Sequence, residues 1–199
     1  GCENHATVSA VNMAGGIAGA NTGAISNSIN HAAVSGKIAG GIVGGSHYRT
    51  ADSDITHVPG RIAVCQNLGS VNGSTYAGGI VGENKDGSIN NCRNDGSVKG
   101  GIVGGVVGYT LFDNDGRYSS GNYTAVVLNS FSTTNSVTGT TVGGVVGKVE
   151  NKNNKNANYS TVENCYYDPQ VLSSVSKAVG SDDKKSTIET VKGETTANM

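Results

Sequence analysis

The stretch GGIVGENKDGSINNCRNDGSVKG at residues 78–100 decides the fold, because its pattern recurs along the whole chain. It begins with a glycine pair, two aliphatic residues and a third glycine. After a variable segment come an aliphatic residue, a Cys three positions later, an Asn two positions after the Cys, and a Val four positions after the Asn. A repeat of this length predicts a protein that stacks one structural unit per repeat.

The glycine-rich pentapeptide occurs at 15–19, 40–44, 78–82, 104–108 and 143–147. A valine precedes each copy by six or seven residues, at Val8, Val34, Val71, Val98 and Val137. This valine excludes the overlapping pentapeptide at 100–104, which would leave Val98 only two residues away. The valines are 26, 37, 27 and 39 residues apart, so the basic unit has about 26 residues and the longer copies carry inserts at about 45–61, 109–124 and 148–160.

Two further landmarks complete the unit. The first is an Asn four residues before the valine, present as Asn4, Asn30, Asn67 and Asn94 and replaced by Thr133 in the fifth copy. The second is an aliphatic residue with Cys or Ser three positions later, at Ile25/Ser28, Ile62/Cys65, Ile89/Cys92, Val127/Ser130 and Val162/Cys165, with Cys2 in the equivalent place at the start.

These units predict an all-β fold, a parallel β-helix or β-solenoid of about five coils with loop inserts. Each unit has several glycines, each of which costs about 1 kcal/mol relative to Ala in a helix, and Val and Ile favour strands. Residues 1–168 form the predicted solenoid. Residues 169–199 form a short non-repeat tail, which we expect to cap the last coil with a short helix after Ser186 or Thr187 and to lead into the next part of a larger protein.

The four cysteines occupy one position of the repeat. We expect a structural ladder of side chains from stacked coils, made of Cys2, Ser28, Cys65, Cys92, Ser130 and Cys165. Parallel Cβ directions in such a ladder disfavour a disulfide, and no Cys-x-x-Cys spacing suggests zinc. An aliphatic residue and a Cys three apart cannot both point inward from a flat strand, so we expect a bend at Asn27, Asn91, Asn129 and Asn164.

Few residues suggest a catalytic, metal-binding or ligand-binding site. His5 and His31 follow equivalent asparagines, which predicts a stacked surface pair in preference to a metal site. The insert with Tyr109, Phe112, Asp113, Asp115, Tyr118 and Tyr123 is a possible binding loop for a sugar or a protein, or these aromatics cover the side of the solenoid. Asp113 and Asp115 faintly resemble a calcium loop, so calcium is the one cofactor considered, and an Asp/Gly turn is the alternative. Acidic residues are scattered, and neither His-Glu-x-x-His nor Gly-x-Ser-x-Gly occurs, so we predict no enzyme activity.

The formal charge of −1 and the absence of a long basic run disfavour nucleic acid as a partner. The apolar stretches fall short of the roughly 20 residues that a membrane helix needs, so we predict no membrane insertion. The abrupt first and last residues lead us to expect a monomeric part of a larger chain.

The combined motif at residues 78–100 resembles the GLUG repeat family, and the resemblance extends over about residues 2–168. The family implies an extracellular location at the bacterial cell surface. Our leading hypothesis is therefore a non-catalytic stalk, spacer or adhesive module, with a host or cell-surface glycan or glycoprotein as the partner to be considered. GLUG repeats also accompany zinc immunoglobulin A peptidases, so an accessory domain that positions the substrate of such a peptidase is the alternative. A polysaccharide-active β-helix enzyme is a third possibility.

Overall fold

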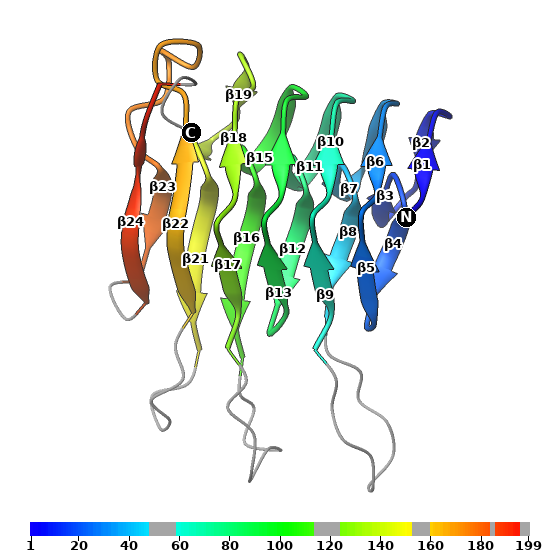
Figure 1. Ribbon diagram of the computed structural model, residues 1–199, viewed down its shortest axis with the longest axis horizontal. Helices are drawn as coiled ribbons and strands as arrows, with labels where there is room; N and C mark the ends of the chain where they lie inside the picture. The colour runs from blue at the N-terminus through cyan, green and yellow to red at the C-terminus, as the bar shows by residue number, and fades with distance from the viewer. Residues whose placement is uncertain (48–58, 114–123, 153–159, 184–185, 196–199) are drawn as a thin grey trace, which may run out of the picture.

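The computed structural model describes residues 1–47, 59–113, 124–152, 160–183 and 186–195. All strand pairs among them are parallel, and equivalent strands of successive repeats lie side by side along one axis (Figure 1). The described residues contain no helix. The predicted all-β solenoid is therefore confirmed, with a chain that completes five coils and begins a sixth.

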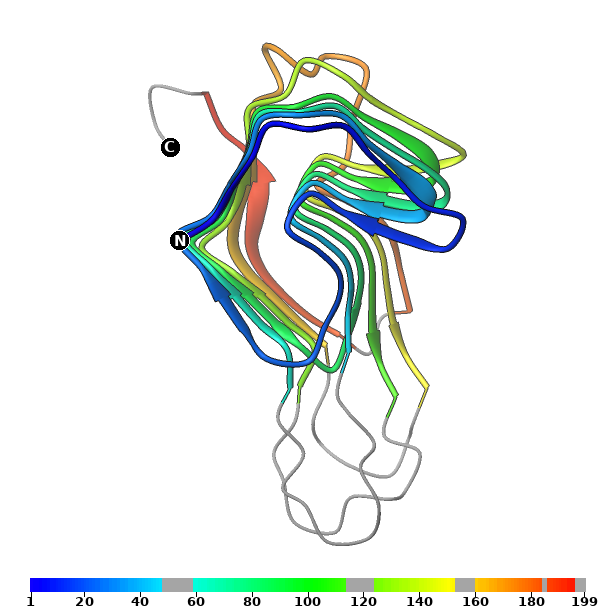
Figure 2. The ribbon, with the colours of Figure 1, turned by 90° about the vertical axis from the view of Figure 1, so that its right-hand side faces the viewer.

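Sheet A is bent in its middle into a V, whose corner lies at the N-terminus label in Figure 2. One half contains β1 (Glu3–Asn4), β6 (Ile29–Asn30), β10 (Gln66–Asn67), β14 (Arg93–Asn94) and β18 (Phe131–Ser132). The other half contains β5 (Ala24–Ser26), β9 (Arg61–Ala63), β13 (Ser88–Asn90) and β17 (Val126–Leu128). Two strands run through both halves, β22 (Thr161–Tyr167) and β24 (Thr187–Gly193).

The corner of sheet A is the bend that the sequence predicts. Asn27, Asn91, Asn129 and Asn164 have φ between 46° and 53°, in the left-handed region that Asn tolerates better than most residues. Val64 has φ 54° at the equivalent position of the third coil. The positive φ interrupts the alternation of side chains along the strand, so the aliphatic residue before the bend and the Cys or Ser after it both face the interior.

Sheet B contains the repeat valine and the first glycine of each pair. Its strands are β2 (Val8–Ser9), β3 (Met13–Gly15), β7 (Val34–Gly40), β11 (Val71–Gly78), β15 (Val98–Gly104), β19 (Val137–Thr138) and β20 (Thr141–Gly143). The register of β11 shifts against both neighbours between Gly73 and Tyr76. This bulge absorbs the extra residue of the third unit, which is why the valine-to-glycine spacing varies between six and seven.

Sheet C contains the residues after the glycine pair. Its strands are β4 (Ala18–Asn21), β8 (Val43–Ser46), β12 (Val81–Lys85), β16 (Val107–Phe112), β21 (Val146–Asn151) and β23 (Val179–Asp182). The chain passes from sheet C back to sheet A at one corner in every coil. Two residues bridge that corner between β4 and β5 and again between β12 and β13, whereas all three inserts leave from it in coils 2, 4 and 5.

The core consists of ladders of small aliphatic side chains. The repeat valines Val34, Val71, Val98 and Val137 are 1–2% exposed, and the isoleucines Ile42, Ile62, Ile80 and Ile89 are fully buried. Burial of such a side chain contributes about 1.5–3 kcal/mol. Their equivalents in the first coil, Val8, Ile17 and Ile25, are only partly buried, because that coil has a neighbour on one side.

A ladder of buried asparagine amides runs through the core beside these aliphatic side chains. The Nδ2 of Asn4 donates to the Oδ1 of Asn30, and the same bond continues from Asn30 to Asn67 and from Asn67 to Asn94, each over 2.7–2.8 Å. Ser132, not Thr133, is the partner of Asn94 in the strand register. The predicted equivalence of Thr133 is therefore wrong, because the fifth coil has an additional residue between Ser132 and Val137.

The glycine pair is explained by close packing at the junction of sheets B and C. A Cβ on Gly78, the first of its pair, would collide with the carbonyl oxygen of Val81. A Cβ on Gly79, the second, would collide with the Cγ of Asn94 in the amide ladder. The second glycine of the pair and the Asn landmark thus pack directly against each other, which explains why both recur in the repeat.

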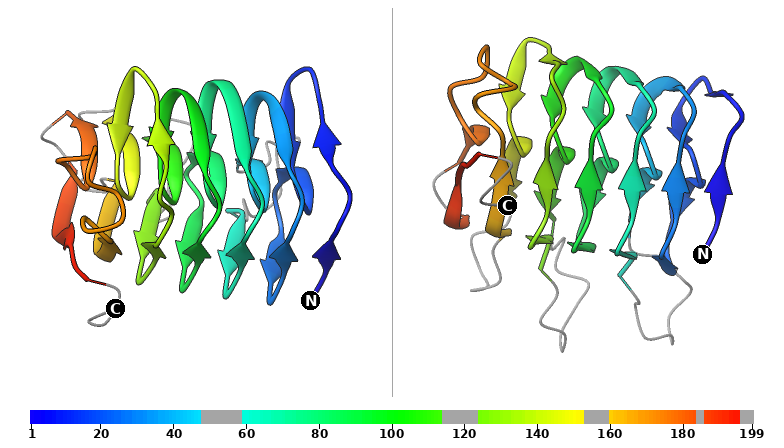
Figure 3. Two further views of the ribbon diagram at one scale, coloured as in Figure 1. Left: turned by 90° about the horizontal axis from the view of Figure 1, so that it is seen from above. Right: turned by 45° about the horizontal axis from the view of Figure 1, so that its top comes forward.

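The tail continues the stack. β23 pairs with β21, and β24 pairs with β22, so these two strands form part of a further coil over the fifth (Figure 3). The predicted helix after Ser186 or Thr187 is wrong: Ile188 stacks on Val162 and Val191 on Cys165, and the gain from burying these aliphatic side chains favours a strand. In the described part of the chain, no helix is long and apolar enough to cross a membrane.

Candidate functional site

Three residues of the predicted binding loop, Tyr109, Phe112 and Asp113, lie in the part of the chain that the structure describes. Tyr109 and Phe112 belong to strand β16 and are 6% and 2% exposed, because the strand extends further into the predicted insert than the sequence pattern indicated. Asp113 follows the strand, and its carboxylate forms an ion pair with the Nζ of Lys85 over 2.9 Å. Asp115, Tyr118 and Tyr123 lie outside the described residues.

Tyr109 is the centre of a polar and aromatic cluster on the outer face of sheet C. Its ring contacts Tyr76 of β11, with 4.8 Å between the ring centroids. Its hydroxyl donates to the Oε2 of Glu150 over 2.8 Å, and the Nζ of Lys148 donates to the same oxygen over 2.7 Å. No sequence pattern indicated this cluster, since its members come from three coils and from different parts of the repeat.

Burial and the hydrogen bond to Glu150 raise the pKa of Tyr109, and burial raises the pKa of Tyr76. The hydrogen bond from Lys148 lowers the pKa of Glu150. The phenol of Tyr109 therefore stays protonated and the carboxylate of Glu150 stays ionised, and the phenol donates its proton in a hydrogen bond to that carboxylate. This pairing of a protonated donor with an ionised acceptor suits a structural contact between coils better than proton transfer.

His47 and Glu83 form a second contact between coils, with 3.6 Å between Nε2 and Oε2. Burial lowers the pKa of His47, and the neighbouring Glu83 carboxylate opposes that shift only in part. This pair has one imidazole and lacks a second nitrogen ligand among the residues that the structure describes.

The cysteine position forms the corner ladder of sheet A. The Sγ of Cys65, Cys92 and Cys165 each donates to the carbonyl oxygen two residues earlier, over 3.1–3.3 Å. The hydroxyls of Ser28 and Ser130 make the same bond over 3.0 and 2.7 Å. Cys and Ser are therefore interchangeable donors that hold the bend closed.

All four cysteines are free, and three of them are buried. Cys2 differs from the expected buried ladder because it lies exposed in the first coil. Burial raises the pKa of Cys165 to about 11. The neighbouring thiols of Cys65 and Cys92 interact, so that the pKa of Cys65 is lowered and that of Cys92 is raised.

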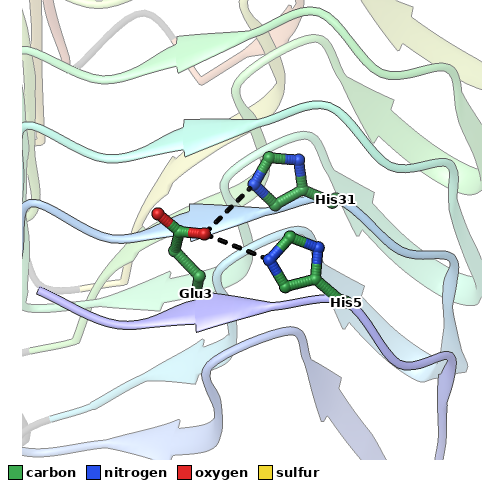
Figure 4. Close-up of side chains that lie close together, drawn as sticks. All are labelled: Glu3, His5 and His31. Atoms are coloured by element: carbon green, nitrogen blue, oxygen red, sulfur yellow. Dashed lines mark hydrogen bonds and ion pairs between the residues drawn. The ribbon is translucent and has the colours of Figure 1, made fainter.

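Glu3, His5 and His31 form the one group of three metal-ligating side chains in the described parts of the chain (Figure 4). The imidazole rings of His5 and His31 are stacked, with 4.3 Å between centroids and 11° between planes, as the repeat predicts. Both turn Nε2 toward the same carboxylate oxygen of Glu3, at 3.1 Å from His5 and 3.8 Å from His31. Glu3 was not predicted as a member of this group, although it lies only two residues before His5.

Another polar network lies at the equivalent position of the fourth coil, around Asp95, which follows Asn94 as His5 follows Asn4. The Oδ1 of Asp95 accepts hydrogen bonds from Arg93 and Thr133, and its Oδ2 accepts one from Gln66 over 2.7 Å. Burial alone would raise the pKa of Asp95, but these hydrogen bonds outweigh it and the pKa is lowered. The positions flanking the Asn ladder thus connect neighbouring coils at both ends of the stack.

Two carboxylates share a register position, which scattered acidic residues in the sequence did not suggest. Glu163 of β22 is paired with Glu189 of β24. Both side chains face outward and are not fully buried. A two-carboxylate hydrolase also needs one carboxyl group in surroundings that keep it protonated, whereas Glu189 is exposed and Glu163 is partly exposed.

Comparison with known proteins supports the repeat assignment. Residues 73–99 match the family described as the GLUG motif. No curated protein matches the chain. A solved structure with the same fold is that of a Bacteroides ovatus protein whose proposed identity is an immunoglobulin A1 protease. It has a TM-score of 0.56 and 20% identity, and the match covers 98% of this chain and 67% of that one. The unit at residues 73–99 is therefore a GLUG motif, and it forms one turn of the solenoid, in register with the turns on both sides of it.

Proposed function

We propose that the chain is a non-catalytic extracellular module of a bacterial surface protein. It would serve as a rigid spacer, and the inserts that follow β8, β16 and β21 would form a binding surface along one edge, the loop edge. The observation that carries this proposal is that all three inserts leave the solenoid at the same corner, between sheet C and sheet A. The coils themselves are stacked in register from β1 to β24. Variable segments at one point of an otherwise constant repeat are typical of a binding edge on a scaffold.

The buried amide ladder supports the scaffold part of the proposal. Asn30, Asn67 and Asn94 are fully buried, and each hydrogen bonds to the coils on both sides. A chain held together in this way resists sliding of one coil over another, because a slip would leave the buried amides without partners. Rigidity of that kind suits a spacer.

An accessory role beside an immunoglobulin A peptidase is the second candidate. The observation that favours it is the shared fold with the Bacteroides ovatus protein. In that role the loop edge would hold immunoglobulin A, and the catalytic residues would belong to another part of the parent protein.

The test uses the full chain and a variant in which residues 47–60 are replaced by Lys-Asp-Gly. Those three residues, 85–87, close the same corner in coil 3. Both proteins are assayed on a glycan array, against immunoglobulin A and other host glycoproteins, and for hydrolysis of polysaccharides and peptides. We expect binding of the full chain to a glycan or glycoprotein, weakened by loop replacement, and no hydrolysis. Release of sugar or peptide would contradict the non-catalytic assignment, and the absence of binding would leave a plain spacer. Binding of immunoglobulin A alone would favour the second candidate.

A further inference from the structure

We propose that Glu3, His5 and His31 bind a divalent transition-metal ion, Zn²⁺ before others, which fastens the first coil of the solenoid to the second. Glu3 and His5 belong to the first coil, and His31 lies directly beside His5 on the second. A metal bound by all three side chains would therefore bridge two coils.

The donor atoms are already within the range that a metal ion needs. All three lie within 4.8 Å of one another, and the two nitrogens are 3.1 and 3.8 Å from the same oxygen. Tetrahedral zinc with bonds of about 2.0–2.1 Å places its ligand atoms roughly 3.4 Å apart. The rings must tilt from their stacked arrangement so that both nitrogens point at one ion, and their side chains, 66% and 34% exposed, have room to do so.

The donor set selects the class of metal. Two imidazoles and one carboxylate suit Zn²⁺, Cu²⁺ or Ni²⁺, whereas Ca²⁺ and Mg²⁺ prefer oxygen ligands alone. Three protein ligands leave the fourth position of a tetrahedral ion for water or for a group from a partner.

The backbone beneath the cluster is held in place before any metal arrives. Asn4 and Asn30, each next to one of the histidines, are joined by their side-chain amides over 2.7 Å. The backbone N–H of His31 donates to the carbonyl oxygen of Asn4 over 2.9 Å. Binding thus has to order only three side chains, which keeps its entropic cost small.

The contact between the first and second coils has fewer fully buried side chains than the contacts deeper in the stack. Val8, Ile17 and Ile25 are only partly buried, whereas their equivalents in the second coil, Val34, Ile42 and Ile62, are at most 1% exposed. An ion that binds the two coils only when they are docked would stabilise the docked state by linkage.

The experiment uses untagged full chain with Cys2→Ser, which removes an exposed thiol that would compete for metal. Serine fills the equivalent position as Ser28 and Ser130. Zn²⁺ is titrated by calorimetry, and hydrogen exchange of residues 3–9 is followed with and without Zn²⁺. We expect one ion per chain and slower exchange in the first coil. His31→Thr and Glu3→Gln should each weaken binding about tenfold or more and abolish the added protection.

These substitutions copy residues that the solenoid already carries at the same positions, since Thr133 is equivalent to His31 and Gln66 to Glu3. Circular dichroism establishes that each variant is folded, and Glu3→Gln decides the matter independently should His31→Thr not fold. His47→Gln is the matched control, because His47 and Glu83 form a His–Glu pair without a second imidazole. Undiminished affinity in a folded His31→Thr or in a folded Glu3→Gln, loss of binding in His47→Gln, or no heat of binding at all would overturn the proposal.

Discussion

The side-chain Nδ2 of Asn30 donates to the Oδ1 of Asn67 over 2.7 Å, between residues 37 positions apart in the sequence. Both side chains are fully buried. The bond joins two coils inside the core, where no water can replace either partner. The buried amides therefore add to the stability that aliphatic packing gives the solenoid, because each would be left without its partner if two coils separated.

Asn67→Ala should destabilise the fold by about 3 kcal/mol, because it removes the acceptor of Asn30 and the donor to Asn94 and leaves both buried. The urea midpoint at an unchanged m-value measures the loss. Asn4→Ala at the end of the ladder is the control, with an expected cost of about 1 kcal/mol, since it has one neighbour in the ladder. Equal costs at the two positions would argue against a cooperative ladder.

Val64→Asn should stabilise the protein by about 1 kcal/mol. Val64 has φ 54°, which strains a β-branched residue, and its side chain is 54% exposed, so little packing is lost. Thermal unfolding measures the gain. The reverse substitution Asn91→Val, at the same position of the next coil, should cost a similar amount. A loss of stability in Val64→Asn would mean that the free energy gained from packing the valine side chain exceeds the cost of its strained backbone.

Gly79→Ala should destabilise the solenoid by about 3 kcal/mol or more, because its Cβ would collide with Asn94 of the amide ladder and with the backbone oxygen of Gly105. Gly23→Ala is the matched control, since the nearest atom to its Cβ would be 4.0 Å away. That substitution should change the free energy of unfolding by no more than about 1 kcal/mol. A tolerated Gly79→Ala would refute the close contact between the glycine pair and the ladder.

Alkaline pH should destabilise the fold in part through Cys165. Burial raises the pKa of its thiol from 9.0 to about 11 in the folded state. The unfolded chain therefore loses this proton first, and the contribution to stability is present below pH 9 and is lost as the pH rises from 9 to 11. The full loss is about 3 kcal/mol. Cys165→Ser, which copies Ser130, should flatten the pH dependence of the urea midpoint over that range, and an unchanged slope would assign the effect to other groups.

Replacement of residues 47–60 by Lys-Asp-Gly should leave the solenoid folded, with a melting temperature at least as high as that of the parent chain. The new corner would copy the two-residue turn after Lys85, and a shorter loop costs less entropy to close. Thermal unfolding and the far-ultraviolet circular dichroism spectrum measure the outcome. Loss of cooperative unfolding would show that this insert contributes to the stack.

The repeat landmarks predicted most of the fold, because equivalent residues in a solenoid meet the same surroundings in every coil. Val34, Val71 and Val98 are paired in register as the sequence indicates. The bend before Cys92 was inferred from side-chain directions alone and is confirmed by the positive φ of Asn91. The landmarks failed where one coil departs from the spacing, as at Ser132, or where the repeat has degenerated.

The sixth coil shows the second kind of failure. Ala178, Val179 and Gly180 lie where the fifth coil has Val145, Val146 and Gly147, but neither glycine of the pair is present before them. Val191 of β24 stands in register with Cys165 of β22, without the thiol of that landmark. Burial in the stack, and not a local sequence signal, makes these residues a coil.

Candidate functional residues were harder to predict than the fold. His5 and His31 are in equivalent places, so their contact followed from the repeat, whereas Glu3 completes the group only through its side-chain direction. Tyr109 contacts Tyr76 and Glu150 across three coils. Such contacts depend on which outward positions of sheets B and C come together, and that is not encoded in the spacing of the landmarks.

The common exit corner of the inserts also has a geometric consequence. Neighbouring strands in a sheet are about 4.8 Å apart, so the attachment points in coils 4 and 5 are separated by roughly 5 Å and those in coils 2 and 4 by roughly 10 Å. A partner that contacts two inserts would therefore meet two attachment points whose separation is set by the stacked coils. Weak individual contacts would then add as in a multivalent ligand, with an effective concentration set by the pitch of the solenoid.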